Sequence, residues 1–408
     1  MNAEPEPEPN RTRNPEPGTG NTTVTNQDSP ILIVGAGIGG LAAALSIQRA
    51  GWSVRVFERS RNPRELGFAL LLAPNATWAL RQLGVADAVI AGGQIATGGE
   101  MCRANGEVLR RFDLSRVRDL LPEPTVTVLR QVLHGTLLTA AGDDVLTLGS
   151  EVVGFSSTAE GVSVTLTDGR RVSGRLLIGA DGVGSVVRRQ LHPREGPPRR
   201  SGLFGLRGVA HGVAHHLGAS SGAQYFGRGI EGGLGKANDT TVYWYLSIPD
   251  RVATAGSMDP AKVLERAVAG FDDRFRSIAF ATAPGDMRLD ELFDREPIER
   301  WGHGNVTLLG DAAHPMLPHA GQGAAQALED AVALGRLLGQ SDEPQIALRE
   351  YERLRSARTG AIVRLARRNA RLGSFENVVA RTLRDWMIRL IPERTILRSL
   401  VAMGRPAR

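Results

Sequence analysis

A glycine-rich segment, Gly35-Ala36-Gly37-Ile38-Gly39-Gly40, directly follows the apolar run Ile31–Val34 and strongly constrains the fold of this chain. A short all-apolar run that ends in glycine is typical of a buried strand in a parallel sheet. Residues 41–50 predict a helix of small residues, and residues 54–58 predict a second strand. A strand, a helix and a strand within about thirty residues favour an α/β fold with a parallel sheet.

The spacing of the glycines also predicts what the segment binds. Gly35 permits the tight turn after the strand, Gly37 lets the backbone approach a pyrophosphate, and Gly40 lets the helix pack closely. The N–H groups freed at the start of the helix then face the phosphates. Glu58 ends the second strand, where a carboxylate accepts hydrogen bonds from a ribose diol. We therefore expect a dinucleotide site, but this fingerprint alone does not distinguish FAD from NAD.

The remaining pattern predicts a second, inserted unit, because 408 residues are too many for one ordinary core. Residues 162–166 alternate before the turn Asp168-Gly169 and predict a hairpin, and buried strands are expected at 176–179 and 306–310. Between these strands the glycines multiply, and residues 241–246 alternate as in an antiparallel sheet. A helix over 324–338 and two more helices in 345–408 complete the expected elements.

Two further motifs lie far downstream. Residues 178–188 read Ile-Gly-Ala-Asp-Gly-Val-Gly-Ser-Val-Val-Arg, and residues 310–323 read Gly-Asp-Ala-Ala-His-Pro-Met-Leu-Pro-His-Ala-Gly-Gln-Gly. With residues 35–40, they resemble the motif set of the class A flavoprotein monooxygenases, the para-hydroxybenzoate hydroxylase superfamily. The subset with salicylate hydroxylase and 6-hydroxynicotinate 3-monooxygenase looks closest. The resemblance spans about residues 30–370 and implies FAD as the cofactor, with NADPH or NADH as a transient reductant.

This resemblance implies a particular domain organisation. The expected fold is a discontinuous Rossmann-like FAD-binding domain with an inserted, mostly antiparallel substrate sheet and C-terminal helices. The N-terminal residues are Pro, Glu, Asn, Thr and Gly, which cannot bury enough apolar surface to order the chain. The predicted boundaries are a disordered tail at 1–29, the FAD-binding domain at 30–195 and 285–345, the substrate domain at 196–284, and the helices at 346–408.

The third motif supports the same cofactor from its own chemistry. Asp311 ends a strand at the carboxyl edge, where open α/β sheets bind ligands, and the family uses this carboxylate to hold a ribityl hydroxyl. The turn Gly321-Gln322-Gly323 precedes a helix whose N-terminus would direct partial positive charge at the flavin. The predicted cofactor-binding residues are Gly35, Gly37, Ile38, Gly39, Gly40, Glu58, Arg59, Gly67, Ala69, Arg130, Asp181, Asp311, Gly321, Gln322 and Gly323. Two alternatives stay open: Asp181 braces its own loop, and Arg130 is an ordinary surface arginine.

The implied reaction inserts one atom of O2 into an aromatic or polyketide-like small molecule through a flavin hydroperoxide, and NAD(P)H is the reductant. The flavin carries the oxygen chemistry, so the protein must orient the substrate, exclude water and help to remove a phenolic proton. Candidate residues for these roles are His211, Tyr225, Tyr243 and His314, with Arg207 as a partner for a substrate carboxylate. Epoxidation, N-hydroxylation and a flavin reductase without oxygenase activity remain alternatives.

Charge and termini suggest no macromolecular partner. The formal net charge is +6, but Lys236 and Lys262 are the only lysines and the arginines are spread along the chain, so we expect no nucleic-acid binding. The single cysteine, Cys102, excludes an internal disulfide and a thiolate metal cage. Without a signal region or a long apolar run, we expect a cytoplasmic monomer or homodimer. An apolar helical face at Val379, Leu383, Met387 and Leu390 is expected to pack on the protein itself, with membrane association as the alternative.

Overall fold

The computed structural model describes residues 29–62 and 68–406, and a five-stranded parallel sheet lies at its centre. The strand order is β18 (Val306–Leu308), β12 (Leu177–Gly179), β1 (Ile31–Val34), β2 (Val54–Phe57) and β8 (Leu146–Thr147). All of β1 is buried. Helix α1 (Ile38–Arg49) packs against α10 (Gly323–Gln340) and α5 (Arg130–Ala141). The α/β class and the strand–helix–strand unit expected from the glycine segment are therefore confirmed.

The expected hairpin is also present, in a small sheet of β9 (Val152–Ser157), β10 (Val162–Leu166) and β11 (Arg171–Gly174). Gly169 lies in the turn between β10 and β11 with a φ of +84°, a conformation that favours glycine. A second small sheet joins β3 (Ala69–Leu72), β7 (Val126–Leu129) and β4 (Gly93–Ile95). The predicted contact at Gly67, just before β3, lies outside the described residues.

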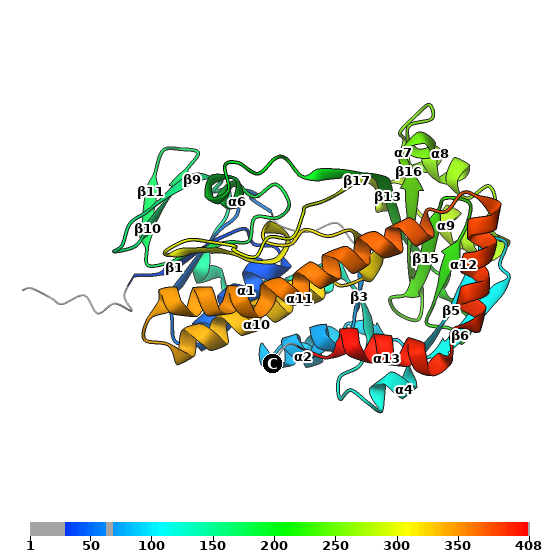
Figure 1. Cartoon of the computed structure of the whole chain (residues 1–408), viewed down its shortest axis with the longest axis horizontal. Helices are drawn as coiled ribbons and strands as arrows, with labels where there is room; N and C mark the ends of the chain where they lie inside the picture. Colours follow the sequence, from blue (N-terminus) through cyan, green and yellow to red (C-terminus); the bar gives the residue numbers. More distant parts are fainter. Residues whose placement is uncertain (1–28, 63–67, 407–408) are drawn as a thin grey trace, which may run out of the picture.

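A seven-stranded sheet stands at the other end of the molecule (Figure 1). Its order is β17 (Met287–Asp294), β13 (Arg199–His211), β16 (Thr241–Pro249), β15 (Glu231–Lys236), β14 (Gly222–Phe226), β5 (Gly98–Arg103) and β6 (Val108–Asp113). Neighbouring strands are antiparallel except for β14 and β5. The antiparallel character was expected, but β5, β6 and β17 lie outside 196–284, so the sheet is larger than the stretch assigned to it.

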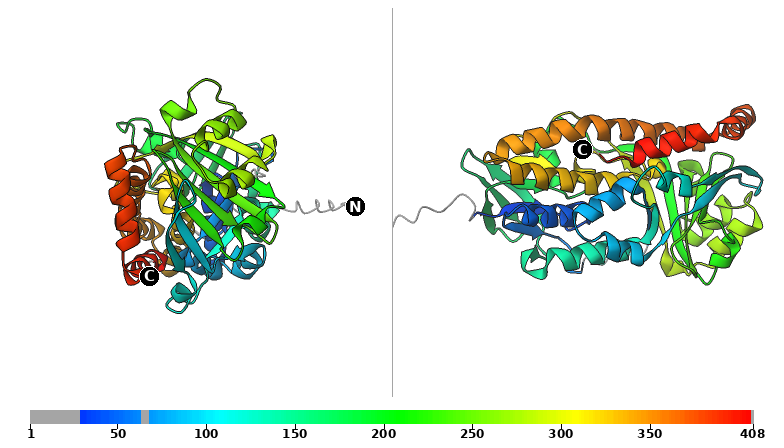
Figure 2. Two further views of the ribbon diagram at one scale, coloured as in Figure 1. Left: turned by 90° about the vertical axis from the view of Figure 1, so that its right-hand side faces the viewer. Right: turned by 90° about the horizontal axis from the view of Figure 1, so that it is seen from below.

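Helices cover one face of the seven-stranded sheet and leave the other face toward the parallel sheet (Figures 1 and 2). Helices α8 (Pro260–Ala267) and α9 (Asp273–Phe280) pack on the outer face over a core that includes Leu206, Trp244 and Phe275. Because side chains alternate along a strand, the neighbours of Leu206 and Trp244 point to the inner face. The other helices before the C-terminal segment are α2 (Pro74–Gln82), α3 (Ala86–Ala91), α4 (Ser115–Arg118), α6 (Val186–Leu191) and α7 (Asp250–Ala253).

The C-terminal segment forms three helices rather than the two expected. Helix α11 (Pro344–Gly373) runs beside α10, α12 (Val378–Leu390) lies along the edge of the seven-stranded sheet, and α13 (Glu393–Gly404) returns toward α2 (Figure 1). The side chain of Asn377 accepts hydrogen bonds from two N–H groups of α12 and starts a new helix there. Pro392 disfavours helical backbone at the residue before it, which ends α12. No helix among residues 29–62 and 68–406 is long and apolar enough to cross a bilayer.

Candidate active site

The glycine-rich segment forms the turn between β1 and α1, and its glycines have different surroundings. Gly35 has a φ of +100°, and a Cβ there would lie 2.5 Å from the carbonyl oxygen of Ala180. A Cβ on Gly40 would lie 1.9 Å from the carbonyl oxygen of Gly35, so α1 approaches β1 only because Gly40 lacks a side chain. A Cβ on Gly37 would meet no atom of the described residues within 4 Å. The backbone at Gly37 is therefore open to a ligand.

Helix α1 starts at this open position. Its N-cap residue is Gly37, which has no side chain to accept hydrogen bonds from the first-turn N–H groups, beginning at Ile38. Free N–H groups at a helix start bind anions, and a pyrophosphate fits this position. Gly39 has a different role, because a Cβ there would lie 2.8 Å from the side chain of Leu309. It allows α1 to pack closely beside the end of β18.

The carboxylate of Glu58 is fixed beside the glycine turn. Its Oε2 accepts a hydrogen bond from the N–H of Ala36 at 2.9 Å, and its Oε1 accepts one from the N–H of Ser60 at 2.8 Å. Buried His134 of α5 donates from Nε2 to the carbonyl oxygen of Ala36 at 2.8 Å, which fixes the same turn from the other side. Each carboxylate oxygen of Glu58 retains a lone pair for a ribose hydroxyl. Arg59 is exposed next to it, and its predicted contact with the cofactor stays a prediction.

The three sequence motifs meet at one edge of the parallel sheet. Gly35 follows β1, Asp181 follows β12 and Asp311 follows β18, and these three strands are parallel neighbours. Their carboxyl ends therefore lie side by side, where open α/β sheets bind ligands. Asp311 remains accessible to solvent although Ala312 beside it is buried. The surrounding protein raises the pKa of the Asp311 carboxyl by desolvation, against the opposing charges of His314 and Arg130.

The start of α10 lies in the third motif. Gly321 has a φ of +61°, and Gln322 is the N-cap of the helix that begins at Gly323. The side chain of Gln322 is buried and accepts hydrogen bonds from Asn75 at 2.9 Å and Gln326 at 3.1 Å. Its side-chain oxygen is therefore occupied inside the protein, and the contact of this turn with the cofactor stays a prediction.

The side chain of Asp181 holds its own loop. Its carboxylate accepts hydrogen bonds from the hydroxyl of Ser185 at 2.5 Å and the N–H of Val186 at 2.7 Å. These contacts agree with the bracing alternative for Asp181. The sequence interpretation missed Arg188, the last residue of the same motif, which donates to the carbonyl oxygens of Ala312 at 3.0 Å and Ala313 at 2.7 Å. Buried Arg188 thus ties the second motif to the loop that carries Asp311.

The inner face of the seven-stranded sheet supplies the second half of the site. Arg207 of β13 is the register partner of Tyr245 of β16, and the Tyr243 and Tyr245 rings stack with centroids 6.2 Å apart. The Arg207 guanidinium lies 5.9 Å from the centroid of Phe68, which precedes β3. Burial raises the pKa of Tyr243 to about 12, so its hydroxyl is protonated at neutral pH and donates hydrogen bonds. This face therefore offers a cation, two phenols and an aromatic ring together.

Arg130 connects this face with the Asp311 edge. It begins α5, and its N–H donates to the carbonyl oxygen of Phe68 at 2.6 Å. Burial lowers the pKa of the Arg130 guanidinium, while the carboxylate of Asp311 raises it and the charge of Arg207 lowers it. Residues at positions 130, 207 and 311 therefore share one electrostatic environment. Whether Arg130 contacts the FAD phosphates stays a prediction. Ala69 is buried at the start of β3 and is paired with Leu129.

A histidine that the sequence interpretation missed joins the two halves. His319, in the third motif, lies with Nε2 2.9 Å from the hydroxyl oxygen of Ser247 on β16, and its Nδ1 is buried with no partner among the described residues. Burial lowers the pKa of His319 to about 4, so the ring is neutral at neutral pH. The side chain of Asn369 on α11 donates to the backbone carbonyl oxygen of His319 at 3.0 Å. The position of His319 inside the motif was visible in the sequence, but its contact with the distant sheet was not.

Two predicted substrate residues are not at this site. Tyr225 points to the outer face of the sheet, where it is fully buried against Phe271 and Phe275 and accepts a hydrogen bond from Arg274 at 2.7 Å. The prediction that Tyr225 contacts the substrate is therefore wrong. His211 shares the face of Arg207 but lies exposed at the last residue of β13, roughly 13 Å farther along the strand.

The predicted role of His314 stays a prediction: its Nε2 is occupied inside the protein, and its buried Nδ1 has no partner among the described residues. His314 is buried, donates from Nε2 to Asp330 at 2.6 Å and packs against Trp301 with the ring centroids 5.4 Å apart. Asp330 also accepts a hydrogen bond from Arg355 at 2.7 Å. The charges of His314 and Arg355 hold the pKa of Asp330 below its usual value despite burial. His314 therefore belongs to a buried polar network beneath the motif.

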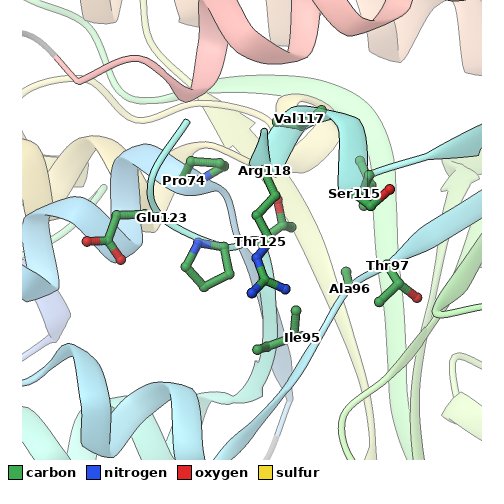
Figure 3. Close-up of a pocket in the computed structure, with 11 residues that line it drawn as sticks. Pro74, Ile95, Ala96, Thr97, Ser115, Val117, Arg118, Glu123 and Thr125 are labelled. Atoms are coloured by element: carbon green, nitrogen blue, oxygen red, sulfur yellow. The ribbon is translucent and has the colours of Figure 1, made fainter. Parts of the chain in front are cut away.

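A small recess elsewhere on the protein is too small to be the binding site of a cofactor or an aromatic substrate. It lies between α2, α4 and the strand end at Ile95 and has a volume of about 30 Å³, enough for a water molecule or two (Figure 3). Its lining contains none of the motif residues. Among residues 29–62 and 68–406, no cluster of three His, Cys, Asp or Glu side chains could hold a metal ion.

The fold and this edge define a flavin-binding protein. The open turn at Gly37, the fixed carboxylate of Glu58 and the accessible carboxylate of Asp311 fit the phosphates and hydroxyls of FAD. Residues 28–366 match the FAD binding domain family. The chain belongs to this family, and within it to the class A flavin-dependent monooxygenases.

Three relatives illustrate the similarity. The aurachin C monooxygenase/isomerase of Stigmatella aurantiaca is 34% identical and aligns over 88% of this chain and 94% of that protein. The 3-hydroxybenzoate 6-hydroxylase 1 of Aquipseudomonas alcaligenes is 33% identical over 81% of this chain and 86% of the relative. The solved structure of Klebsiella pneumoniae HpxO with FAD and uric acid superposes with a TM-score of 0.86 at 28% identity, covering 93% of this chain and 97% of that one. The predicted family and cofactor are thus confirmed.

Proposed function

We propose that this protein is an FAD-dependent monooxygenase that hydroxylates a small aromatic compound bearing an ionisable hydroxyl group. In the overall reaction, the substrate, O2, NAD(P)H and a proton yield the hydroxylated product, water and NAD(P)+. The carrying observation is that Phe68 links the two cations: its carbonyl oxygen accepts a hydrogen bond from the N–H of Arg130, and its ring centroid lies 5.9 Å from the Arg207 guanidinium. Asp311 and Tyr243 both act electrostatically on Arg130. FAD, when bound, supplies the electron transfer and the activation of oxygen.

The side chains of the inner face would orient the substrate and its charge. Arg207 and Arg130 both act electrostatically on Tyr243, so an anionic substrate oxygen would be stabilised there. A phenolate is a better electron donor than a phenol, and two cations favour its formation without a side-chain base. Tyr243 keeps its proton at neutral pH and would donate a hydrogen bond to the same oxygen. The ring of Phe68 would exclude water from the other side.

Gly37, Ile38, Glu58 and Asp311 would hold the cofactor. The first-turn N–H groups of α1 would face the pyrophosphate, Glu58 a ribose hydroxyl and Asp311 a ribityl hydroxyl. The seven-stranded sheet would then belong to the substrate domain and meet the substrate with its inner face. The FAD-binding domain would comprise the residues around the parallel sheet. One relative is by name a 3-hydroxybenzoate 6-hydroxylase, and the HpxO structure contains uric acid, which supports a small cyclic substrate of this class.

The test is a panel of phenols, hydroxyquinolines and aromatic carboxylates added to the FAD-loaded protein with NADH or NADPH. A substrate should stimulate NAD(P)H oxidation, and product mass should increase by one oxygen atom. The Arg207→Gln variant should lose roughly tenfold or more in kcat/KM for an anionic substrate while retaining bound FAD. Arg276, an exposed arginine on the outer helix α9, is a matched control as Arg276→Gln. If no compound stimulates NAD(P)H oxidation and no oxygenated product forms, the proposal of a hydroxylase for a small phenolic substrate fails.

A further inference from the structure

Helix α12 presents an apolar face to solvent. Val379 and Trp386 are 70% and 60% exposed, and Leu383, Met387 and Leu390 are exposed as well. At about 100° per residue these five side chains fall within an arc of roughly 100° on the helix. The sequence pattern favoured packing of this face against the protein itself, and the structure contradicts that expectation. The helix stands at the outer edge of the molecule (Figure 2).

The opposite side of α12 is firmly attached, so the apolar face has a fixed orientation. Arg384 and Asp385 are buried and bonded to each other at 2.8 Å, and Asp385 also pairs with Arg103 of β5 at 2.7 Å. The guanidinium of Arg384 lies 4.8 Å from the ring centroid of Phe226 on β14. These contacts use the polar side of the helix for packing and leave the apolar side outward.

A cationic groove runs beside the same helix. It has a volume of about 550 Å³ and lies between α12, the ends of β5 and β14, and the segment from α8 to α9. Arg228, Arg266 and Arg381 line it, and no salt bridge to a carboxylate is found for them among the described residues, although Arg266 donates to two backbone carbonyl oxygens. The Nε atoms of Arg266 and Arg381 are buried without a hydrogen-bond partner there. The only acidic lining residue, Asp385, is already paired with two arginines.

We propose that α12 and this groove form a docking surface for an anionic lipid bilayer. The apolar arc would enter the interfacial layer, with Trp386 at the headgroup level, and the groove arginines would meet the lipid phosphates. An apolar helical face beside arginines that lack carboxylate partners is the chemistry that an anionic membrane surface complements. A second copy of the chain fits less well, because a two-fold interface on this surface would bring the same arginines toward one another.

The test is flotation of the full-length, FAD-loaded protein with phosphatidylglycerol vesicles and with phosphatidylcholine vesicles. The protein should float with the anionic vesicles and not with the neutral ones, and added salt should weaken binding. The double variant Leu383→Ser/Trp386→Ser should lower the partition coefficient by more than roughly 100-fold. Arg228→Gln/Arg381→Gln should lower it by roughly tenfold or more. Ile346→Ser, at an exposed apolar residue of α11, should change nothing.

Two readouts keep the result unambiguous. Trp386 is the exposed tryptophan among the five of this chain, so its emission should shift to the blue on anionic vesicles, and the shift should vanish in Trp386→Phe. Bound-FAD absorbance should report that each variant is folded. Absence of flotation with phosphatidylglycerol at low salt would overturn the proposal. A second contradicting result would come from light scattering. The wild-type protein would be a dimer, Leu383→Ser/Trp386→Ser would be a monomer, and neither protein would bind vesicles.

Discussion

Tyr225 and Tyr243 project from opposite faces of the same seven-stranded sheet. Tyr225 accepts a hydrogen bond from Arg274 in the outer core, whereas Tyr243 lies on the inner face with Arg207. Tyr243→Phe should therefore lower kcat/KM by roughly tenfold to 100-fold, because one hydrogen bond to a charged oxygen is lost, with little change in stability.

The matched variant Tyr225→Phe should behave in the opposite way. Removal of its hydroxyl leaves the Nε of Arg274 without that acceptor, so the free energy of unfolding should fall by about 1–2 kcal/mol while kcat/KM is unchanged. Urea unfolding and steady-state kinetics on both variants check this. Equal losses of kcat/KM in the two variants would contradict the assignment of the substrate to the inner face of the sheet.

Two glycines of the same turn should separate cofactor binding from folding. Gly37→Ala places a methyl group where the described residues leave open space, and its φ of −73° suits alanine, so the apoprotein should fold normally. Its affinity for FAD should fall by roughly tenfold or more, because the methyl group occupies the approach to the phosphates. Flavin fluorescence quenching measures this.

Gly40→Ala is the contrasting variant. Its methyl carbon would overlap the carbonyl oxygen of Gly35 at 1.9 Å, so α1 and β1 must separate and the apoprotein should lose stability by several kcal/mol. A Gly40→Ala apoprotein as stable as wild type would show that the close approach of helix and strand is not required.

His319 should make stability depend on pH. Its pKa is about 4 in the folded protein and about 6.5 in an unfolded chain, so the unfolded state binds more protons between these values. Stability should therefore fall as the pH falls from 6.5 to 4. His319→Gln should remove about 2 kcal/mol of this dependence. Thermal unfolding of the two proteins across that pH range measures this difference. Stability curves that run parallel in the two proteins would contradict the burial of a neutral imidazole at His319.

The buried network beneath the third motif should be a major source of stability. Arg355 is fully buried and bonds to both Asp330 and Glu329 at 2.7 Å. Arg355→Ala should lower the free energy of unfolding by about 3–5 kcal/mol, because two carboxylates lose the cation that compensates them. Arg353→Ala, on the exposed side of the same helix, should change it by less than about 0.5 kcal/mol. Similar losses in the two variants in urea would contradict the role given to Arg355.

Much of the cofactor edge could be predicted from the sequence, because it depends on local rules. Glu58 and Asp311 each follow a short apolar strand, and the carboxyl ends of parallel strands share one edge. Which residues point to the substrate depends instead on the pairing register of the strands. Alternation shows that Tyr243 and Trp244 point to opposite faces, but only the pairing of β14, β15 and β16 relates Tyr225 to them.

Contacts between distant segments account for the other differences. His314 and His319 belong to one motif, yet one ring turns toward Asp330 and the other toward Ser247 on the sheet. Their directions depend on helices α10 and α11 and on strand β16, which no local pattern places. The apolar arc of α12 was visible as a periodicity, but its exposure follows from Arg384 and Asp385 packing on the opposite side.

The Asp311 edge would hold FAD, and a substrate on the Arg207–Tyr243 face would receive one atom of O2 there. Turnover of a stimulating substrate under 18O2 in ordinary water, followed by mass spectrometry of the product, tests it most directly. We expect one 18O atom in the product, and a product yield per NAD(P)H that falls in Tyr243→Phe. Oxygen derived from water, or NAD(P)H oxidation that the substrate does not change, would contradict it.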